Sequence, residues 1–400
     1  MKLDRLCRAL FFLLLVLYIF KFDINNVPIV YIYTILVFII LIPLFVYKEQ
    51  KLDLPMLLFG IYVVSQTFLA WVIWGIWEEQ VFKTLLLVVG NIGLYIIFLP
   101  YLTLKGLVNI ISLVGILYIP FSFYELINTQ SIGIYRYTST FSDPNYYGIL
   151  VLLFMTVFLM KIFVFNSRIA FLYLILFMLC ILILFFTFSR SVYLSLFVYL
   201  ISLFYIGKRD YIKKFSKYFS IIFLTMIILI YLSVNRYGIF DLDRIISFLG
   251  WRFFSKSEIE SGFSRLNEIV AGINFMTSEF PLSLIGAGTG STEVHAFYSR
   301  YYITFTLIEP RIHNTFFAVL VENSIVGFLP FMFLLYRSFM RIRNHDSKIK
   351  PYSMALFLSF LTSSMFIWNL YYLPFYIAMF YIPMFAGPIH PLRKNKVRSY

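Results

Sequence analysis

The chain has 400 residues, of which 61% are hydrophobic and 13% are charged, with a formal net charge of +14. This apolar fraction excludes a soluble globular protein and indicates an integral membrane protein. In a soluble protein the basic charge would suggest nucleic acid, but here it follows the positive-inside rule, so we expect no nucleic-acid partner. Cys7 and Cys180 lie in apolar runs, which favours buried thiols over a disulfide or a metal site.

Apolar runs long enough to cross a membrane, about 20 residues each, recur along the whole chain. The sequence therefore predicts an all-α, polytopic membrane protein with about twelve spans in one domain, residues 1–400. The run 8–22 is interpreted as the first span and not as a signal peptide, because no small-residue cleavage site follows it. The predicted spans are 8–22, 28–47, 55–77, 82–102, 106–126, 144–165, 168–187, 190–207, 217–234, 313–336, 352–369 and 371–389.

Lys and Arg residues orient the predicted bundle. Outside the segment 235–312, most of them lie at the two termini and in connections on one side, such as 208–217 and 337–350. The short connections on the other side hold only Lys21, Lys83, Arg136 and Arg190. Because basic loops stay in the cytoplasm, both termini are predicted to be cytoplasmic.

Two connections on the outward side are longer than the rest. Residues 127–143 form a medium outer loop rich in Tyr, Ser and Thr, and residues 235–312 form a long and nearly neutral outer loop. Loops of that length are uncommon and usually functional. The stretch "SRLNEIVAGINFM" has near-helical apolar spacing, so we expect short helices within the long loop.

The first polar cluster is "YRYTSTFSDPNYYG", residues 135–148. Asp143 and Asn145 flank a proline just before an apolar run, which is typical of a capped helix start. That structural interpretation competes with substrate binding by Asp143 and Asn145. Arg136 is harder to explain structurally, because few outward positions are basic, and we treat it as a substrate-binding candidate.

The second cluster is Ser189-Arg190-Ser191, between two apolar runs. An arginine at the bilayer centre costs about 2.5–3.5 kcal/mol on insertion scales, so its presence needs a reason. Arg190 can reach lipid phosphate by snorkelling, or it can bind a phosphate that the protein acts upon.

The third cluster holds Arg265 and the glycine-rich "GAGTGS" of residues 286–291. We do not interpret the glycines as a nucleotide-binding loop, because no strand precedes them, no lysine follows them and they lie outside the cell. They more simply allow a tight backbone path close to a ligand or a helix. Asp241 and Asp243 resemble a metal-binding pair of nucleotide-sugar enzymes, but nucleotide sugars are cytoplasmic, so no metal site is expected.

The fourth cluster is "RIHNTFFAVLVENSIVG", residues 311–327. An imidazole can accept a proton near neutral pH, so His313, flanked by Arg311 and Asn314, is a candidate general base. A satisfied polar histidine and a helix N-cap at Asn314 are the structural interpretations that compete with this one. If His313 and Glu322 are both helical, they lie on nearly opposite faces, roughly 13 Å apart along the axis. Glu322 is therefore predicted to be buried against a separate polar partner.

The order of these four clusters resembles the O-antigen polymerase/O-antigen ligase superfamily over roughly residues 130–330. The matching motifs are "F-x-D-P-N-x-x-G", "S-R-S", "S-R-L…P-L-x-x-I-G-x-G" and "H-N…E-N-x-x-x-G". The resemblance implies a GT-C-like glycosyltransferase that needs no metal and no cofactor, in the bacterial cytoplasmic (inner) membrane. It implies that Arg190 and Arg265 bind the diphosphate of an undecaprenyl-diphosphate-linked oligosaccharide and that His313 is the base, with Arg136 a weaker match.

We expect a polymerase of O-antigen or capsule repeat units, with lipid-linked oligosaccharides as donor and acceptor. A ligase that transfers the glycan to lipid A–core differs only in its acceptor. A flippase for lipid-linked oligosaccharides or a scaffold would also be polytopic, but transporters often show internal repeats and charges deep in several helices. Membrane lipid, a chain-length regulator and a flippase are the further expected partners.

Overall fold

A computed structural model shows the chain to be helical almost throughout the part that it describes. It describes residues 3–21, 23–24, 27–47, 52–76, 78–132, 136–141, 143–207, 247, 250, 255–301, 312–344 and 348–386. The strands within these ranges, β1 (Asp23–Ile24) and β2 (Val27–Pro28), pair antiparallel between the first two helices. The predicted all-α class is therefore confirmed as a helical membrane fold.

The helices follow the predicted apolar runs closely. All predicted spans coincide with helices except 217–234, which lies outside the described residues. The last predicted span, 371–389, is a composite of three short pieces. The helices are α1 (Leu3–Phe20), α2 (Ile29–Tyr47), α3 (Leu54–Trp74), α4 (Glu79–Phe98), η1 (Leu99–Tyr101), α5 (Leu104–Ile132), α6 (Pro144–Phe163), α7 (Ala170–Phe186), α8 (Arg190–Ile206), α11 (Lys256–Ser278), η2 (Leu282–Ile285), η3 (Ser291–Glu293), α12 (His295–Tyr301), α13 (Thr315–Arg343), α14 (Lys350–Ser363), α15 (Leu373–Tyr376), η4 (Ile377–Tyr381) and α16 (Ile382–Ala386).

Within the described part of the chain, five helices are long and apolar enough to cross a membrane by length and composition. They are Leu54–Trp74, Glu79–Tyr101, Leu104–Asn128, Pro144–Phe163 and Thr315–Arg343. Helices α7 and α8 are also apolar but shorter. These helices establish a membrane protein, and the total of about twelve spans stays a prediction.

Helix α6 lies at the centre of the bundle, where it packs against α5, α7, α8 and α14. Gly148 in its first turns lets α8 approach closely, since an added Cβ there would lie 2.4 Å from Cγ2 of Val192. Small residues of this kind permit close packing of helices in membranes. The first turns of α6 and α8, which carry two of the predicted polar clusters, are therefore held against each other.

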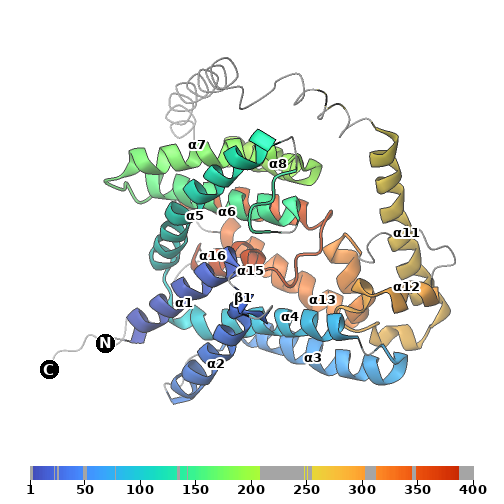
Figure 1. Cartoon of the computed structure of the whole chain (residues 1–400). Coiled ribbons are helices and arrows are strands. Elements are labelled where there is room, and N and C mark those ends of the chain that lie inside the picture. The colour runs from blue at the N-terminus through green and yellow to red at the C-terminus, as the bar shows by residue number, and fades with distance from the viewer. Residues whose placement is uncertain are drawn as a thin grey trace.

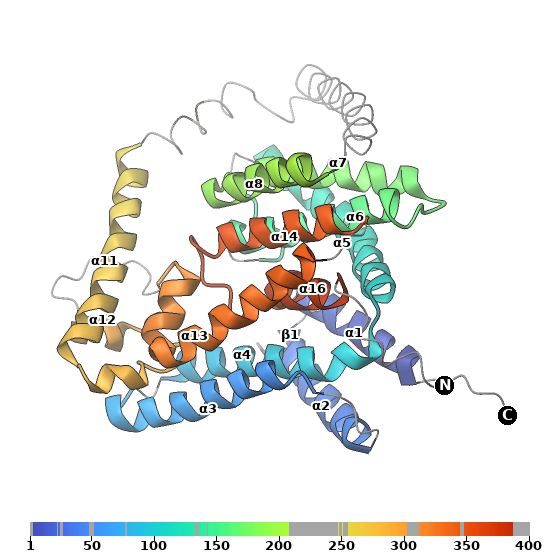
Figure 2. The same ribbon diagram turned by 180° about the vertical axis from the view of Figure 1, so that it is seen from behind.

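Helix α11 runs in a different direction from most of the bundle. Both views show it crossing one end of the molecule, beside α12 and the neighbouring ends of α3 and α13 (Figures 1 and 2). This end also carries the first residues of α13. The positive-inside rule predicts that this is the outward face of the membrane.

Helix α13 is broken at Ser324, where φ is 58° and ψ is −177°. Backbone carbonyls released by such a break need new donors, because none is available from lipid. The carbonyl oxygen of Val321 accepts from the backbone N–H of Ala287 at 3.0 Å, and that of Glu322 accepts from the N–H of Gly288 at 2.9 Å. The break is thus stabilised by the glycine-rich segment 286–291.

The glycine-rich segment is buried between α3, α4 and α13. Gly286 has φ +87°, and an added Cβ would lie 2.4 Å from the carbonyl oxygen of Glu322. Its carbonyl oxygen accepts from Nε1 of Trp74 at 2.9 Å. The glycines therefore serve close approach to a helix, which was one of the two roles predicted for them.

Gly286→Ala is expected to lower the thermal unfolding midpoint of the purified protein in detergent. A non-glycine residue at positive φ costs about 1–3 kcal/mol, and the clash with the Glu322 carbonyl adds to that cost. Gly90→Ala is the matched control, because Gly90 lies within α4 and a Cβ there meets nothing within 4 Å. Equal midpoints for the two variants would contradict the packing described.

Candidate functional site

The first two predicted clusters are hydrogen-bonded to each other at the starts of α6 and α8. Asp143 caps α6 by accepting from the N–H of Asn145 at 2.6 Å. The Oδ1 atom of Asn145 accepts from the hydroxyls of Ser189 and Ser191, the latter at 2.7 Å. Ser189 is also the N-cap of α8. These hydrogen bonds therefore fix the position of Arg190, the first residue of that helix.

Asn145 is only 8% exposed, and its side-chain oxygen is engaged inside the protein. Its observed contacts position Arg190, and direct substrate binding by Asn145 stays a prediction. Asp143 combines its capping role with a second one, since its negative charge acts on Arg136 and Arg265. The structural and functional interpretations of this cluster are thus compatible.

Three arginines from separate elements gather at the same end of the molecule. Arg136 comes from the connection 136–141, Arg190 from the start of α8 and Arg265 from α11. Burial lowers the pKa of Arg136, and the charges of Arg265 and Arg190 lower it further, against the opposing effect of Asp143. Burial also lowers the pKa of Arg265. The charges of Glu268 and Asp143 raise this pKa, and the charge of Arg190 lowers it further.

The guanidinium groups of Arg136 and Arg265 are held in a buried environment that disfavours their charge. The charge of Asp143 acts on both Arg136 and Arg265, and that of Glu268 acts on Arg265. The Nε atom of Arg136 is buried and has no hydrogen-bond partner among the described residues. An anion with several oxygen atoms would supply an acceptor for this nitrogen, and arginine binds phosphate oxygens in pairs.

His313 lies immediately beside this cluster and is held by Glu268 of α11. Its Nδ1 atom is 2.9 Å from Oε2 and 3.0 Å from Oε1 of Glu268, and its backbone N–H donates to Oε2 at 3.0 Å. The Glu268 side chain is 3% exposed, whereas that of His313 is 20% exposed. The Nδ1 side of the imidazole is therefore held by Glu268, and the side chain is accessible in part.

The sequence interpretation missed Glu268. It stands three residues after Arg265, a spacing that places both side chains on one face of a helix. That spacing was the available signal. Its contact with His313 joins positions 45 residues apart and could not be read from local pattern.

The start of α13 is fixed by hydrogen bonds within the helix and to the segment that follows α14. Asn314 is its N-cap and accepts from the N–H of Phe317 at 3.0 Å, so the structure shows the capping role that was considered for Asn314. Thr315 donates its hydroxyl to the carbonyl oxygen of Ile367 at 2.6 Å and accepts from the N–H of Asn369 at 2.9 Å. These bonds hold the backbone from which His313 projects.

His313 precedes the N-cap, so it is not part of α13. The predicted placement of His313 and Glu322 on opposite faces of one helix therefore does not apply. The two residues have different hydrogen-bond partners, as was expected. Glu322 is fully buried, and its Oε1 atom accepts from the hydroxyl of Thr292 at 2.5 Å and from the N–H of Thr292 at 3.3 Å. Thr292, next to the glycine-rich segment, is thus the polar partner that the sequence left unnamed.

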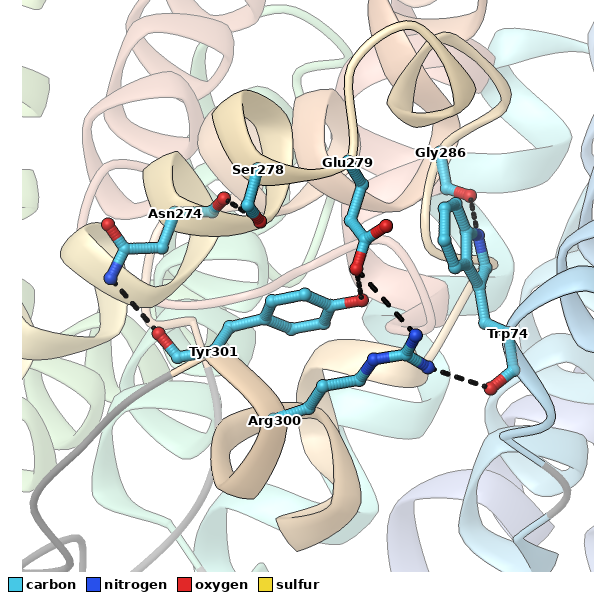
Figure 3. A network of polar contacts seen from close by, with 7 residues as sticks. All are labelled: Trp74, Asn274, Ser278, Glu279, Gly286, Arg300 and Tyr301. Atoms are coloured by element: carbon cyan, nitrogen blue, oxygen red, sulfur yellow. Dashed lines mark hydrogen bonds and ion pairs between the residues drawn. The ribbon is translucent and has the colours of Figure 1, made fainter.

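A second polar network anchors the far end of α11 (Figure 3). Glu279 accepts from the hydroxyl of Tyr301 at 3.1 Å and lies 3.7 Å from Nη2 of Arg300. Arg300 also donates to the carbonyl oxygen of Trp74 at 3.3 Å, and Asn274 donates to the carbonyl oxygen of Tyr301 at 3.0 Å. Because this network ties α11 and α12 to α3, it helps fix the position of Arg265 and Glu268.

The remaining predicted features fall partly outside the structure. Arg311, the span 217–234 and the pair Asp241 and Asp243 lie outside the described residues. Within the described part of the chain, no group of three or more His, Cys, Asp or Glu side chains could hold a metal ion. The side chains of the site itself are the imidazole of His313 and the neighbouring cluster of arginines.

One comparison with known proteins gives a match. Residues 175–332 match the family model described as O-antigen ligase. This range begins in α7 and ends in α13, so it includes Arg190, Arg265, Glu268 and His313 and leaves out Arg136. No curated protein matches the sequence.

Proposed function

The chain is a member of the O-antigen polymerase/ligase superfamily over residues 175–332, and on this premise we propose that it polymerises undecaprenyl-diphosphate-linked repeat units. The reaction takes place on the outer face of the bacterial cytoplasmic membrane, within a GT-C-like bundle of about twelve spans with both termini in the cytoplasm. The single observation that supports it best is the His313–Glu268 pair beside three arginines.

The proposed reaction requires a base and an anion site, and these residues supply both. His313 takes the proton from an acceptor sugar hydroxyl, whose oxygen forms a bond to the anomeric carbon of the donor. The bond from that carbon to the phosphate oxygen breaks, and undecaprenyl diphosphate leaves with the electron pair. Arg136, Arg190 and Arg265 bind the diphosphate and stabilise the charge that develops on it, an effect that is strong in a site with little water.

A sugar diphosphate is already an activated donor, so the proposed reaction needs neither ATP nor a metal ion. The apolar bundle faces lipid and accommodates the polyprenyl chain of the substrate. Arg311 and Asn314, at the start of the same segment as His313, stay substrate-binding predictions, with Asn314 also serving as the N-cap. Contacts with a chain-length regulator and a flippase remain part of the proposal.

A ligase is the second candidate, and it is favoured by the description of the matching family model. It uses the same donor and the same chemistry, with lipid A–core as the acceptor. Neither the contacts of His313 nor the arginine cluster distinguishes the two acceptors, because both reactions release undecaprenyl diphosphate.

Deletion of the gene in its host tests the proposal. A polymerase deletion is expected to leave glycan of a single repeat attached to lipid, as seen on a gel of surface polysaccharide. Loss of all attached glycan, with long lipid-linked polymer accumulating, would show a ligase. Loss of outward-facing lipid-linked units altogether would show a flippase and contradict the proposal.

A further inference from the structure

We propose that Glu268 is a positioning residue for the base. It holds His313 in the tautomer that carries its proton on Nδ1, so that Nε2 is the nitrogen that accepts the proton of the acceptor hydroxyl. This inference rests on the proposed function, because it specifies how His313 is prepared for that reaction.

The hydrogen bonds of Glu268 determine the tautomer. An ionised carboxylate only accepts hydrogen bonds, so an imidazole nitrogen 2.9 Å from Oε2 and 3.0 Å from Oε1 must be the donor. With the proton on Nδ1, a neutral imidazole has its lone pair on Nε2, on the opposite side of the ring. The contact between Glu268 and His313 thus selects the tautomer with its proton on Nδ1. In that tautomer Nε2 can accept the proton of the acceptor hydroxyl.

The same carboxylate also fixes the orientation of the ring. Glu268 accepts from the backbone N–H of His313 at 3.0 Å in addition to the ring nitrogen. Two anchors on one residue restrict rotation of the imidazole about its side-chain bonds. The Glu268 carboxylate is itself almost fully buried, which strengthens a charge-assisted hydrogen bond.

Helix α11 places the base and the anion site at a fixed separation. Arg265 and Glu268 are three residues apart, or about 4.5 Å along a helix axis. Arg265 therefore holds the leaving diphosphate while Glu268, about one turn later, holds the base. The Glu279–Arg300–Tyr301 network at the end of α11 keeps this helix in place (Figure 3).

Glu268 belongs to a group of charged side chains that includes three arginines and Asp143. Arg265 lies on the same helix as Glu268, Arg190 comes from α8, and Arg136 and Asp143 come from the connection between α5 and α6. In the proposed reaction the Glu268 carboxylate is placed to stabilise the imidazolium that forms when His313 takes the proton. The Glu268 carboxylate is in direct contact with the ring.

Glu268→Gln in the purified, full-length protein tests the inference. An amide can donate as well as accept, so the variant no longer selects the productive tautomer. We expect the rate of elongation at saturating substrate to fall about 10²–10⁴-fold, the scale of general-base catalysis. Binding of undecaprenyl diphosphate should stay within about 2-fold of wild type, because the arginines are unchanged. Glu79→Gln, at an exposed carboxylate paired with Lys83, is the matched control and should retain full activity.

Nitrogen NMR of protein labelled in its four histidines gives a readout independent of activity. The His313 signals, assigned by their loss in His313→Ala, should show a protonated Nδ1 in the wild type and a changed tautomer population in Glu268→Gln. An unchanged tautomer, full activity, or a parallel loss of undecaprenyl diphosphate binding would each overturn the role proposed for Glu268. Full activity of His313→Ala would instead refute the base in the proposed function, so the two failures are distinguishable.

Discussion

Replacing His313 by alanine should reduce glycan elongation about 10²–10⁴-fold, because the acceptor hydroxyl loses its general base. The glycan ladder of a complemented deletion strain should collapse to single repeats, although the variant protein is present at wild-type level in the membrane. Undecaprenyl diphosphate should still bind, since Arg190 and Arg265 are unchanged. The measurement is a gel of surface glycan together with initial rates of the purified variant.

Ser299→Ala is a suitable control for this variant. Ser299 is exposed on α12, and its hydroxyl donates to a backbone carbonyl oxygen within that helix, so its loss should leave the ladder intact. A full-length ladder in the His313→Ala strain would eliminate His313 as the base.

Replacing Arg190 or Arg265 by glutamine should weaken undecaprenyl diphosphate binding by about 10- to 100-fold each. Hydrogen bonds to charged groups contribute about 1.5–3 kcal/mol, and each 1.4 kcal/mol is about tenfold in affinity. Burial lowers the pKa of Arg265 and the charge of Arg190 lowers it further, against the opposing effects of Glu268 and Asp143, so the charge of Arg265 is disfavoured in the fold. The ligand-free Arg265→Gln protein should therefore keep its thermal midpoint while the midpoint shift caused by ligand is lost.

The matched control is Arg343→Gln, at an exposed arginine in the last turn of α13. It removes the same charge without touching the cluster, and its ligand-induced midpoint shift should equal that of the wild type. Equal binding by Arg343→Gln and Arg265→Gln would show that the diphosphate is held elsewhere.

The helical bundle could be predicted because apolar runs of membrane length dominate the sequence. The side of the membrane expected for each cluster followed from the distribution of Lys and Arg, and the structure brings Arg136, Arg190, Arg265 and His313 to one end. These features depend on local composition and on order along the chain, which a single sequence contains.

Other features depend on contacts between distant segments. Helix α13 contains Pro330, but its break falls at Ser324. At that point the glycine-rich segment supplies hydrogen-bond donors to the carbonyls of Val321 and Glu322. Glu268 could not be told from the other carboxylates of the long loop without the packing of α11 beside the start of α13. The hydrogen bonds by which Asn145 joins α6 to α8 were likewise not evident from the sequence. Local pattern cannot predict which distant backbone or side chain completes a hydrogen bond.

Reconstitution of the purified protein in liposomes with lipid-linked single repeat units tests the central claim most directly. The proposed polymerase predicts a ladder of longer lipid-linked glycans and release of one undecaprenyl diphosphate for each bond formed, without added metal or nucleotide. Single units that stay unextended, and that are transferred only when lipid A–core is added, would contradict the polymerase and identify the ligase.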